Sequence, residues 1–228
     1  MVDARMTEMA ETATARANIY GLLTAAFRVE PSSSFLTRLK DPDILGVLEG
    51  LGVSLGEDFR DSPNEQLRED LAIEFTRLFL GPRGHISPHE SLHTDSASDG
   101  NADLWGADTV KVKRFMEAAG LAVDDNFTGM PDHISAEMEF MQQLTTKEAE
   151  AWTEADEEFA TNILKIERRF YDEHLSRWVA RFCDKLIEAA EHPFYRGIAE
   201  VTKGFIEYEG KNTQVLIADA GNGEDDNS

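Results

Sequence analysis

The sequence has a single cysteine and no hydrophobic run long enough to span a membrane. Cys183 has no second cysteine to pair with, which excludes an intrachain disulfide. A transmembrane helix needs about 18 or more consecutive apolar residues, and no such stretch occurs. The first residues also lack the basic and then apolar regions of a secretory signal. We therefore expect a cytoplasmic protein without stable membrane insertion.

Basic residues are scarce: 22 Lys and Arg stand against 44 Asp and Glu, a net charge of −22. Such a surface repels nucleic acids and anionic membranes and attracts basic partners. The excess is uneven, because residues 124–158 hold eleven carboxylates and one lysine. The charge is explained either by solubility in a high-salt habitat or by recognition of a basic ligand.

Strand-like alternation is nearly absent, whereas apolar residues recur at helical spacing along most of the chain. The pattern predicts an all-α protein, a single helical-bundle-like domain of about eight or nine helices within residues 1–215. The predicted helices cover residues 6–27, 33–40, 43–51, 62–80, 104–119, 132–149, 154–171, 173–190 and 194–208.

Two irregular stretches divide this pattern, at residues 81–103 and 121–131. The second predicts a hinge between an N-terminal lobe, residues 1–120, and a C-terminal lobe, residues 132–209. Gly120 is predicted to end its helix in a left-handed conformation. The last residues, 216–228, are expected to form an acidic, disordered tail.

The helix predicted to begin near residue 132 carries an unusual group of titratable residues at its start. His133 and Glu137 are four residues apart and share one helix face. Asp132 is positioned to cap the helix by accepting hydrogen bonds from its first free N–H groups. Such a cluster is suited to catalysis, metal binding or recognition of a partner, and spacing alone leaves these alternatives open.

Three histidines in the first irregular stretch raise a metal-dependent hydrolase as the alternative function. His85, His89 and His93 are spaced four apart, which on one helix would form a zinc-binding face. Pro88 would interrupt that helix, so the prediction of a metal site is not favoured. The chain also lacks a phosphate-binding P-loop and a nucleophile elbow.

Peptide binding is a further alternative. An all-α body can present an apolar groove between helices, rimmed by carboxylates. Such a groove suits a ligand with basic residues followed by an apolar stretch, because carboxylates pair with arginine. The residues predicted as its apolar walls are Phe75, Leu78, Phe79, Trp105, Phe140 and Met141.

Four segments go beyond general composition. They are Glu74–Pro82, with Arg-Leu-Phe-Leu-Gly-Pro at its end, Pro88–Ser91, Pro131–Ile134 followed by Glu137, and His174–Cys183. In this order and spacing, over roughly residues 15–208, the chain resembles the TorD/DmsD/NarJ-type family of cytoplasmic chaperones. These proteins mature molybdenum-containing oxidoreductases.

The resemblance implies an all-α fold without catalytic turnover and without a cofactor or metal of its own. It implies binding of the twin-arginine signal peptide on the catalytic subunit of a molybdopterin oxidoreductase, which holds back export until the cofactor is loaded. The protein would be a monomer or a homodimer, and the client enzyme is not identified. The residues that the resemblance places at the peptide site are Asp132, His133, Glu137, Phe75, Arg77, Phe79, Pro88, Glu90 and Ser91. Trp105, one of the predicted apolar walls, is expected to belong to the same binding site.

Overall fold

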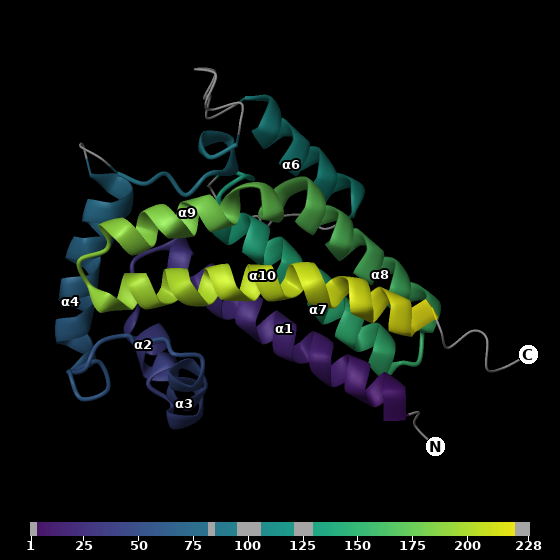
Figure 1. Cartoon of the computed structure of the whole chain (residues 1–228), viewed down its shortest axis with the longest axis horizontal. Helices are drawn as coiled ribbons and strands as arrows, with labels where there is room; N and C mark the ends of the chain where they lie inside the picture. The colour runs from purple at the N-terminus through teal and green to yellow at the C-terminus, as the bar shows by residue number, and fades with distance from the viewer. Residues whose placement is uncertain (1–3, 82–84, 95–105, 121–129, 222–228) are drawn as a thin grey trace, which may run out of the picture.

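The computed structural model describes residues 4–81, 85–94, 106–120 and 130–221, and most of these are helical (Figure 1). Among them no β-strand forms beyond one isolated bridge, so the predicted all-α class is confirmed. The helices, with short π- and 3-10-helical turns labelled η, are α1 (Ala4–Arg28), α2 (Ser33–Leu39), α3 (Pro42–Gly50), α4 (Asn64–Phe75), η1 (Thr76–Leu80), η2 (Glu90–Leu92), α6 (Ala107–Ala118), α7 (Ile134–Thr153), α8 (Glu157–Phe170), η3 (Tyr171–Leu175), α9 (Ser176–Ala189) and α10 (Pro193–Gly221).

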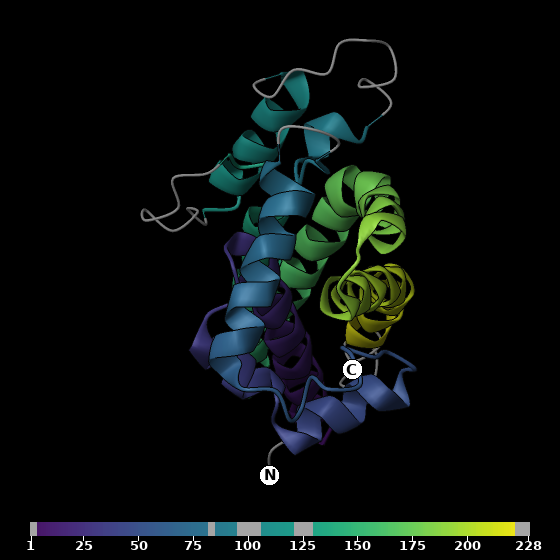
Figure 2. The same ribbon diagram turned by 90° about the vertical axis from the view of Figure 1, so that its left-hand side faces the viewer.

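The long helices form a bundle with one main core. α1 packs along α7, α8 lies against α7 and α10, and α9 turns back into α10. Figure 2 shows α4 crossing in front of this bundle, with α6 at one end and α2 and α3 at the other. The core continues across the predicted lobe boundary: Phe27 of α1 and Phe182 of α9 meet with their ring centroids 5.7 Å apart. The described parts of the two halves therefore share one hydrophobic core.

A second, polar core ties four helices together. The Arg16 guanidinium of α1 binds Glu148 of α7 at 2.7 Å, Glu209 of α10 at 2.8 Å and Glu167 of α8. All four side chains are almost fully buried. Burial raises the pKa values of Glu148 and Glu167, and the Arg16 charge opposes that rise. Because a buried charge is costly unless it is paired, this network fixes how the four helices sit together.

α10 is longer than the sequence suggests. It continues from the predicted end at residue 208 to Gly221, so residues 216–221 are helical and the tail predicted for 216–228 begins too early. Leu216 and Ala220 are buried in a second, smaller apolar cluster with Trp152 and Met9. This contact supplies the apolar burial that makes an otherwise polar stretch helical. Residues 222–228 lie outside the described residues.

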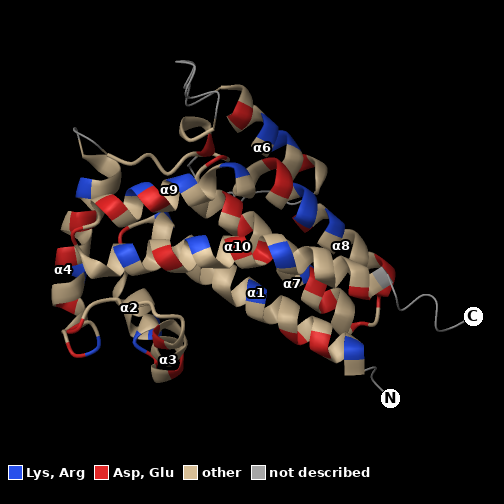
Figure 3. Ribbon diagram, viewed as in Figure 1, with Lys and Arg blue, Asp and Glu red and all other residues tan. Residues whose placement is uncertain are grey.

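The predicted end of α6 is confirmed, since Gly120 has a positive φ of 70° directly after the helix. The predicted hinge at 121–131 lies mostly outside the described residues, which resume at Met130. Within the described part of the chain, no helix is both long enough and apolar enough to cross a bilayer. Acidic residues appear on nearly every helix in Figure 3, with basic residues between them.

Candidate functional site

Two of the sequence motifs meet where residues 85–94 run against the start of α7. His89 and His133 form an antiparallel bridge. On either side of it, the Glu90 N–H donates to the Asp132 carbonyl at 2.9 Å, and the Ile134 N–H donates to the Pro88 carbonyl at 2.8 Å. We call this junction of residues 88–94 with residues 131–137 the seam. It brings most of the predicted site residues together.

His133, not Asp132, caps α7. The helix begins at Ile134, one to two residues later than predicted, and the His133 Nδ1 accepts a hydrogen bond from the Ser135 N–H at 3.1 Å. The prediction that Asp132 caps the helix is wrong. The Asp132 carboxylate instead accepts from the Ser91 N–H at 3.3 Å and from the Thr109 hydroxyl at 3.1 Å. It therefore holds the loop and α6 against the seam.

Three carboxyl groups at the seam are shielded from solvent. Glu90, Asp132 and Glu137 each have no exposed surface. The Trp178 indole N–H donates to Glu137 at 3.1 Å, and the His174 Nδ1 lies 2.9 Å from Glu90. Burial raises the pKa of Glu137 well above its ordinary value, and the nearby Glu90 charge raises it further. The site is thus a buried cluster of carboxyl groups and hydrogen-bond acceptors.

The seam has more acceptors than donors. Among the described residues, Asp132 Oδ1 and Ser91 Oγ are buried without a hydrogen-bond partner. Glu90 Oε1 and Glu137 Oε1 also lack a hydrogen-bond donor from another residue, although Arg177 Nη1 lies 3.8 Å from Glu90 Oε1 and the raised pKa of Glu137 favours a proton between the two carboxyl groups. Buried polar atoms are normally satisfied, so unpaired acceptors at one place mark a strained or functional site. A group that carries only donors, such as a guanidinium, would complement it.

His89 and His133 are partly exposed members of the seam and contact each other. Their rings meet edge to face with centroids 5.0 Å apart. Burial lowers the pKa of His133 to about 3, and the charges of His89 and Arg28 lower it further. Burial also lowers the pKa of His89. Both imidazoles are therefore neutral near pH 7.

Most of the predicted peptide-site residues in the seam are buried and do not face solvent. Glu90, Ser91, Asp132 and Glu137 are buried because they hold loop N–H groups, an indole and an imidazole rather than facing solvent. Pro88, His89, Leu92, Pro131 and His133 are the partly exposed members of the seam. Because the carboxylates have no exposed surface, a ligand would reach them only if the seam opened.

The predicted residues on α4 and η1 belong to a different part of the molecule. Phe75 and Phe79 are buried, and Phe79 stacks on Phe182 of α9. Arg77 binds Glu74 with an Nε–Oε2 distance of 2.6 Å and donates to the Ala189 carbonyl at 2.7 Å. These contacts anchor the end of α4 to the connection between α9 and α10. Trp105, also predicted, lies outside the described residues.

The histidine pattern does not form a metal site. His93 stacks on Trp178, its Nε2 lies 2.6 Å from the Ser87 carbonyl, and its Nδ1 lies 3.3 Å from Lys185. His85 is exposed, and His89 faces His133. Nowhere in the described ranges do three or more His, Cys, Asp or Glu residues gather in a way that could hold a metal ion. The metal-dependent hydrolase therefore gains no support.

Sequence reasoning missed a second feature, an apolar groove of about 790 Å³ between α1, α3 and α10. Its signal was present, because α1 carries apolar side chains on two faces: Tyr20 and Leu23 point into the core, and Ile19 and Leu22 line the groove. A helix that is apolar on more than one face has a second surface to cover.

A helical bundle with a covered acidic seam and an open apolar groove defines a binding protein more readily than an enzyme. Residues 47–184 match the family described as nitrate reductase delta subunit, and the chain belongs to this family. It is 24% identical over 207 residues to the chaperone protein TorD of Vibrio cholerae, covering 85% of this chain and 90% of the relative. It is 26% identical over 205 residues to TorD of Photobacterium profundum, covering 85% and 92%.

A solved structure has the same fold. It is described as a redox enzyme maturation protein from Archaeoglobus fulgidus and aligns with a TM-score of 0.50 at 18% identity, over 84% of this chain and 93% of that one. The predicted family is confirmed. The chain is therefore a member of a chaperone family and not an enzyme.

Proposed function

We propose that this chaperone matures the catalytic subunit of a molybdopterin oxidoreductase. In the cytoplasm it binds the twin-arginine signal peptide of that subunit and holds back export until the cofactor is loaded. Family membership supports the chaperone role. The net charge of −22 favours a basic leader, because a strongly acidic surface steers cationic ligands toward it.

The observation that carries the proposal is the excess of buried acceptors at the seam. Asp132 Oδ1, Glu90 Oε1 and Glu137 Oε1 are buried without a hydrogen-bond donor from another residue in the described part of the chain, and the Arg177 guanidinium lies 3.8 Å from Glu90 Oε1. A leader arginine offers five N–H donors and no acceptor, which is the complement of this group. Hydrogen bonds from arginine to carboxylates are charge-assisted and are stronger than neutral ones.

The free-energy cost of opening the seam is comparable with what a bound arginine supplies. The loop is joined to the start of α7 by two backbone hydrogen bonds, from Glu90 and from Ile134, and by one from the Ser91 N–H to the Asp132 carboxylate. The backbone bonds are worth a net of about 0.5–1.5 kcal/mol each and the bond to the carboxylate about 1.5–3 kcal/mol, so separating all three costs roughly 2.5–6 kcal/mol. Two buried arginine–carboxylate hydrogen bonds, worth about 3–6 kcal/mol together, would offset this cost.

Calorimetric titration with synthetic leaders tests the proposal. The probes are a peptide with two adjacent arginines before an apolar stretch, the same peptide with both arginines replaced by glutamine, and a scrambled sequence. We expect the arginine peptide to bind at least about tenfold more tightly, a difference of about 1.4 kcal/mol. Equal binding of all three peptides, or of none, would overturn the proposal.

The variant Asp132→Asn tests whether the leader arginines bind at the seam, because it keeps the side-chain shape and removes the charge. It should weaken the arginine peptide by about tenfold or more and leave the glutamine peptide unchanged. Asp108→Asn is the matched control, since Asp108 is also buried but already binds Lys111 and Thr94. Similar losses in both variants would show that the seam has no special role.

A further inference from the structure

The two glutamates of the seam meet in the interior of the molecule. Glu90 begins η2, and Glu137 lies in the first turn of α7. Neither side chain has exposed surface, and the two carboxyl groups lie within hydrogen-bonding reach of each other. Two ionised carboxylates in this position would repel each other strongly, because burial removes the water that screens them. A proton between the two groups ends that repulsion and lets one carboxyl group donate to the other.

The other contacts of this glutamate pair do not replace the proton. The Trp178 indole N–H donates to Glu137 Oε2 at 3.1 Å. The His174 Nδ1 lies 2.9 Å from Glu90 Oε2. The second oxygen of each carboxyl group, Oε1, has no hydrogen-bond donor from another described residue. Burial raises the pKa of Glu137 well above its ordinary value and the Glu90 charge raises it further, which favours one retained proton near pH 7.

Charged groups next to the glutamate pair leave it short of positive charge. Asp132 is a third carboxyl group without exposed surface, and its charge also raises the pKa of Glu137. On α9, the Arg177 guanidinium is 39% exposed and lies 3.8 Å from Glu90 Oε1, beyond hydrogen-bonding distance. A partly exposed charge at this distance is screened by solvent and compensates the pair only in part.

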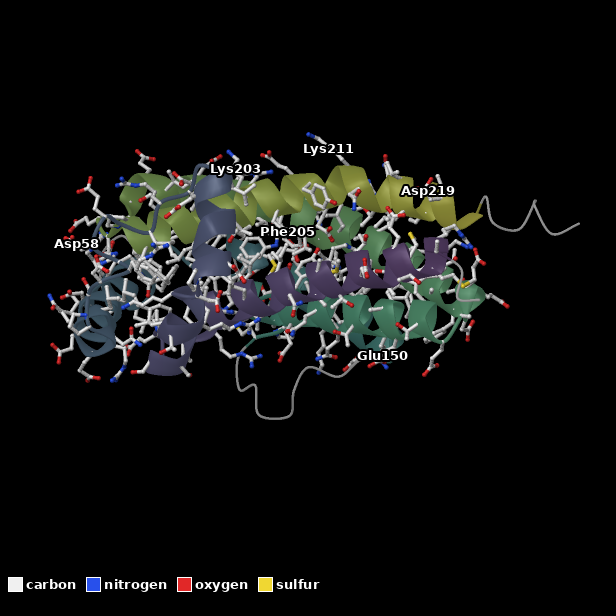
Figure 4. All side chains as sticks on the ribbon, turned by 90° about the horizontal axis from the view of Figure 1, so that it is seen from below. Asp58, Glu150, Lys203, Phe205, Lys211 and Asp219 are labelled. Carbon is white, nitrogen blue, oxygen red and sulfur yellow. The ribbon has the colours of Figure 1, made fainter. Side chains whose placement is uncertain are left out.

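Further cations on neighbouring helices bind elsewhere. Those of α1, α6 and α9 contact groups outside the glutamate pair: Arg28 binds Glu139, Lys111 binds Asp108, and Arg181 donates to the His93 carbonyl. On α10, Lys203 and Lys211 point outward from the bundle (Figure 4). The shared proton therefore supplies positive charge that these side chains do not bring to the pair.

A leader arginine can take the place of this proton. A guanidinium stays protonated at every ordinary pH and carries donors only. Against two carboxylates it favours their ionised forms, because an opposite charge nearby lowers the pKa of a carboxyl group. The buried charge is the same before and after, since a protonated pair and two carboxylates with a guanidinium each carry one negative charge. We propose that the seam binds the leader arginine in exchange for the proton of the glutamate pair, which passes to solvent.

The exchange rests on the proposed function and makes leader binding depend on pH. Each proton released on binding raises the association constant about tenfold per pH unit. Between about pH 6.5 and 7.5 we therefore expect the arginine leader to bind roughly tenfold more tightly at the higher pH. His89 and His133 have no proton to release near pH 7, since burial lowers the pKa of each imidazole.

Calorimetry in several buffers counts the protons. The wild-type protein is titrated at about pH 7 with the arginine leader, its ends blocked, in buffers with different heats of ionisation such as phosphate and Tris. The dependence of the measured heat on the buffer gives the number of protons released, and we expect about one per leader. The affinity of the glutamine leader should not change with pH.

Glu137→Gln removes the shared proton and keeps the shape of the side chain. Its amide N–H can donate to Glu90, and its carbonyl oxygen can still accept from Trp178. Binding of the arginine leader should then release no proton near pH 7, and its affinity should change by less than about twofold between pH 6.5 and 7.5. Glu167→Gln is the matched control, because Glu167 is also a buried carboxyl group whose pKa is raised by burial but binds Arg16 away from the seam. It should release a proton as the wild type does.

Circular dichroism and urea unfolding establish that both variants fold, and the proton count of the wild type decides the question even if Glu137→Gln does not. Tight binding of the arginine leader without proton release would overturn the exchange and leave the proposed function intact. Release that persists in Glu137→Gln would place the proton outside the glutamate pair and would also overturn it. If the wild type does not distinguish arginine from glutamine, the proposed function itself fails.

Discussion

The contacts of His133 favour the neutral form of its imidazole. Its Nδ1 accepts the hydrogen bond that starts α7, and its ring packs edge to face on His89. Protonation of Nδ1 would remove that acceptor and place a positive charge in a poorly solvated position. The pKa of His133 is accordingly lowered to about 3, with burial as the largest cause.

The lowered pKa of His133 predicts a loss of stability in acid. The unfolded chain takes up this proton near pH 6.5, whereas the folded chain does so only near pH 3. Between these values the unfolded state binds more protons, so the free energy of unfolding decreases as the pH is lowered, by up to about 1.4 kcal/mol per pH unit. His133→Asn keeps a capping oxygen and loses the titration. Between about pH 7.5 and 5.5 we expect it to lose roughly 1 kcal/mol less stability than the wild type.

Urea unfolding at both pH values measures this difference. His85→Asn is the control, because it removes a histidine from an exposed position outside the seam. Parallel pH profiles for His133→Asn and the wild type would show that His133 titrates normally in the folded protein.

At the residue scale, the sequence could predict which motifs meet but not that they are covered. The Pro88–Ser91 and Pro131–Ile134 segments do adjoin across the seam. The partners that bury Asp132 and Glu137 are the Ser91 N–H and the Trp178 indole, each 41 residues away along the chain. No local pattern encodes such pairings. The Arg16 network was missed for the same reason, since its carboxylates lie 132 to 193 residues from Arg16.

Two glycines of α10 should respond to the same substitution in opposite directions. A Cβ at Gly197 would lie 2.8 Å from the Ser54 carbonyl oxygen and 3.0 Å from Leu55, so Gly197→Ala forces the backbone apart. Overpacking of this kind costs about 1–3 kcal/mol. At Gly204 nothing lies within 4 Å, and Gly204→Ala should add about 0.5–1 kcal/mol of stability.

Thermal and urea unfolding of the two single variants check this prediction. Both substitutions change the same residue type in the same helix, so each serves as the control for the other. A gain at both positions would mean that the contact of α10 with residues 53–55 is looser than observed. A loss at Gly204 would mean that the helix is strained there.

At the element scale, apolar periodicity and turn residues predicted most of the helices, and α10 shows where that reasoning stops. Its inner stripe continues through Glu209, Thr213, Leu216 and Ala220, all of which are buried. Because two of these four residues are polar, the apolar pattern predicts that the helix ends at residue 208 and that a disordered tail begins at residue 216. Glu209 is buried because Arg16 and Tyr20 bind it, and these partners come from the other end of the chain. A hydrophobic pattern cannot show burial that depends on a distant ion pair.

At the scale of the whole molecule, the chain carries a net charge of −22, and its acidic residues are spread over nearly every helix (Figure 3). Like charges distributed in this way repel one another in the folded state and relax on unfolding. The same field extends beyond the surface and draws cationic ligands toward it. One property thus weakens the fold and speeds encounter with a basic leader.

Added salt tests both consequences, because it screens the repulsion within the folded protein and the attraction between the protein and a basic leader. The Debye length falls from about 10 Å at 0.1 M to about 3 Å at 1 M ionic strength. Raising sodium chloride from about 0.05 to 0.5 M should therefore raise the melting temperature by relieving self-repulsion. Over the same range, stopped-flow measurements should show the association rate of the arginine leader falling by about tenfold or more, and that of the glutamine leader falling less.

A melting temperature that falls with salt would mean that paired charges such as Arg28–Glu139 outweigh the repulsion. Equal salt dependence for the two leaders would mean that the acidic field does not select the arginines.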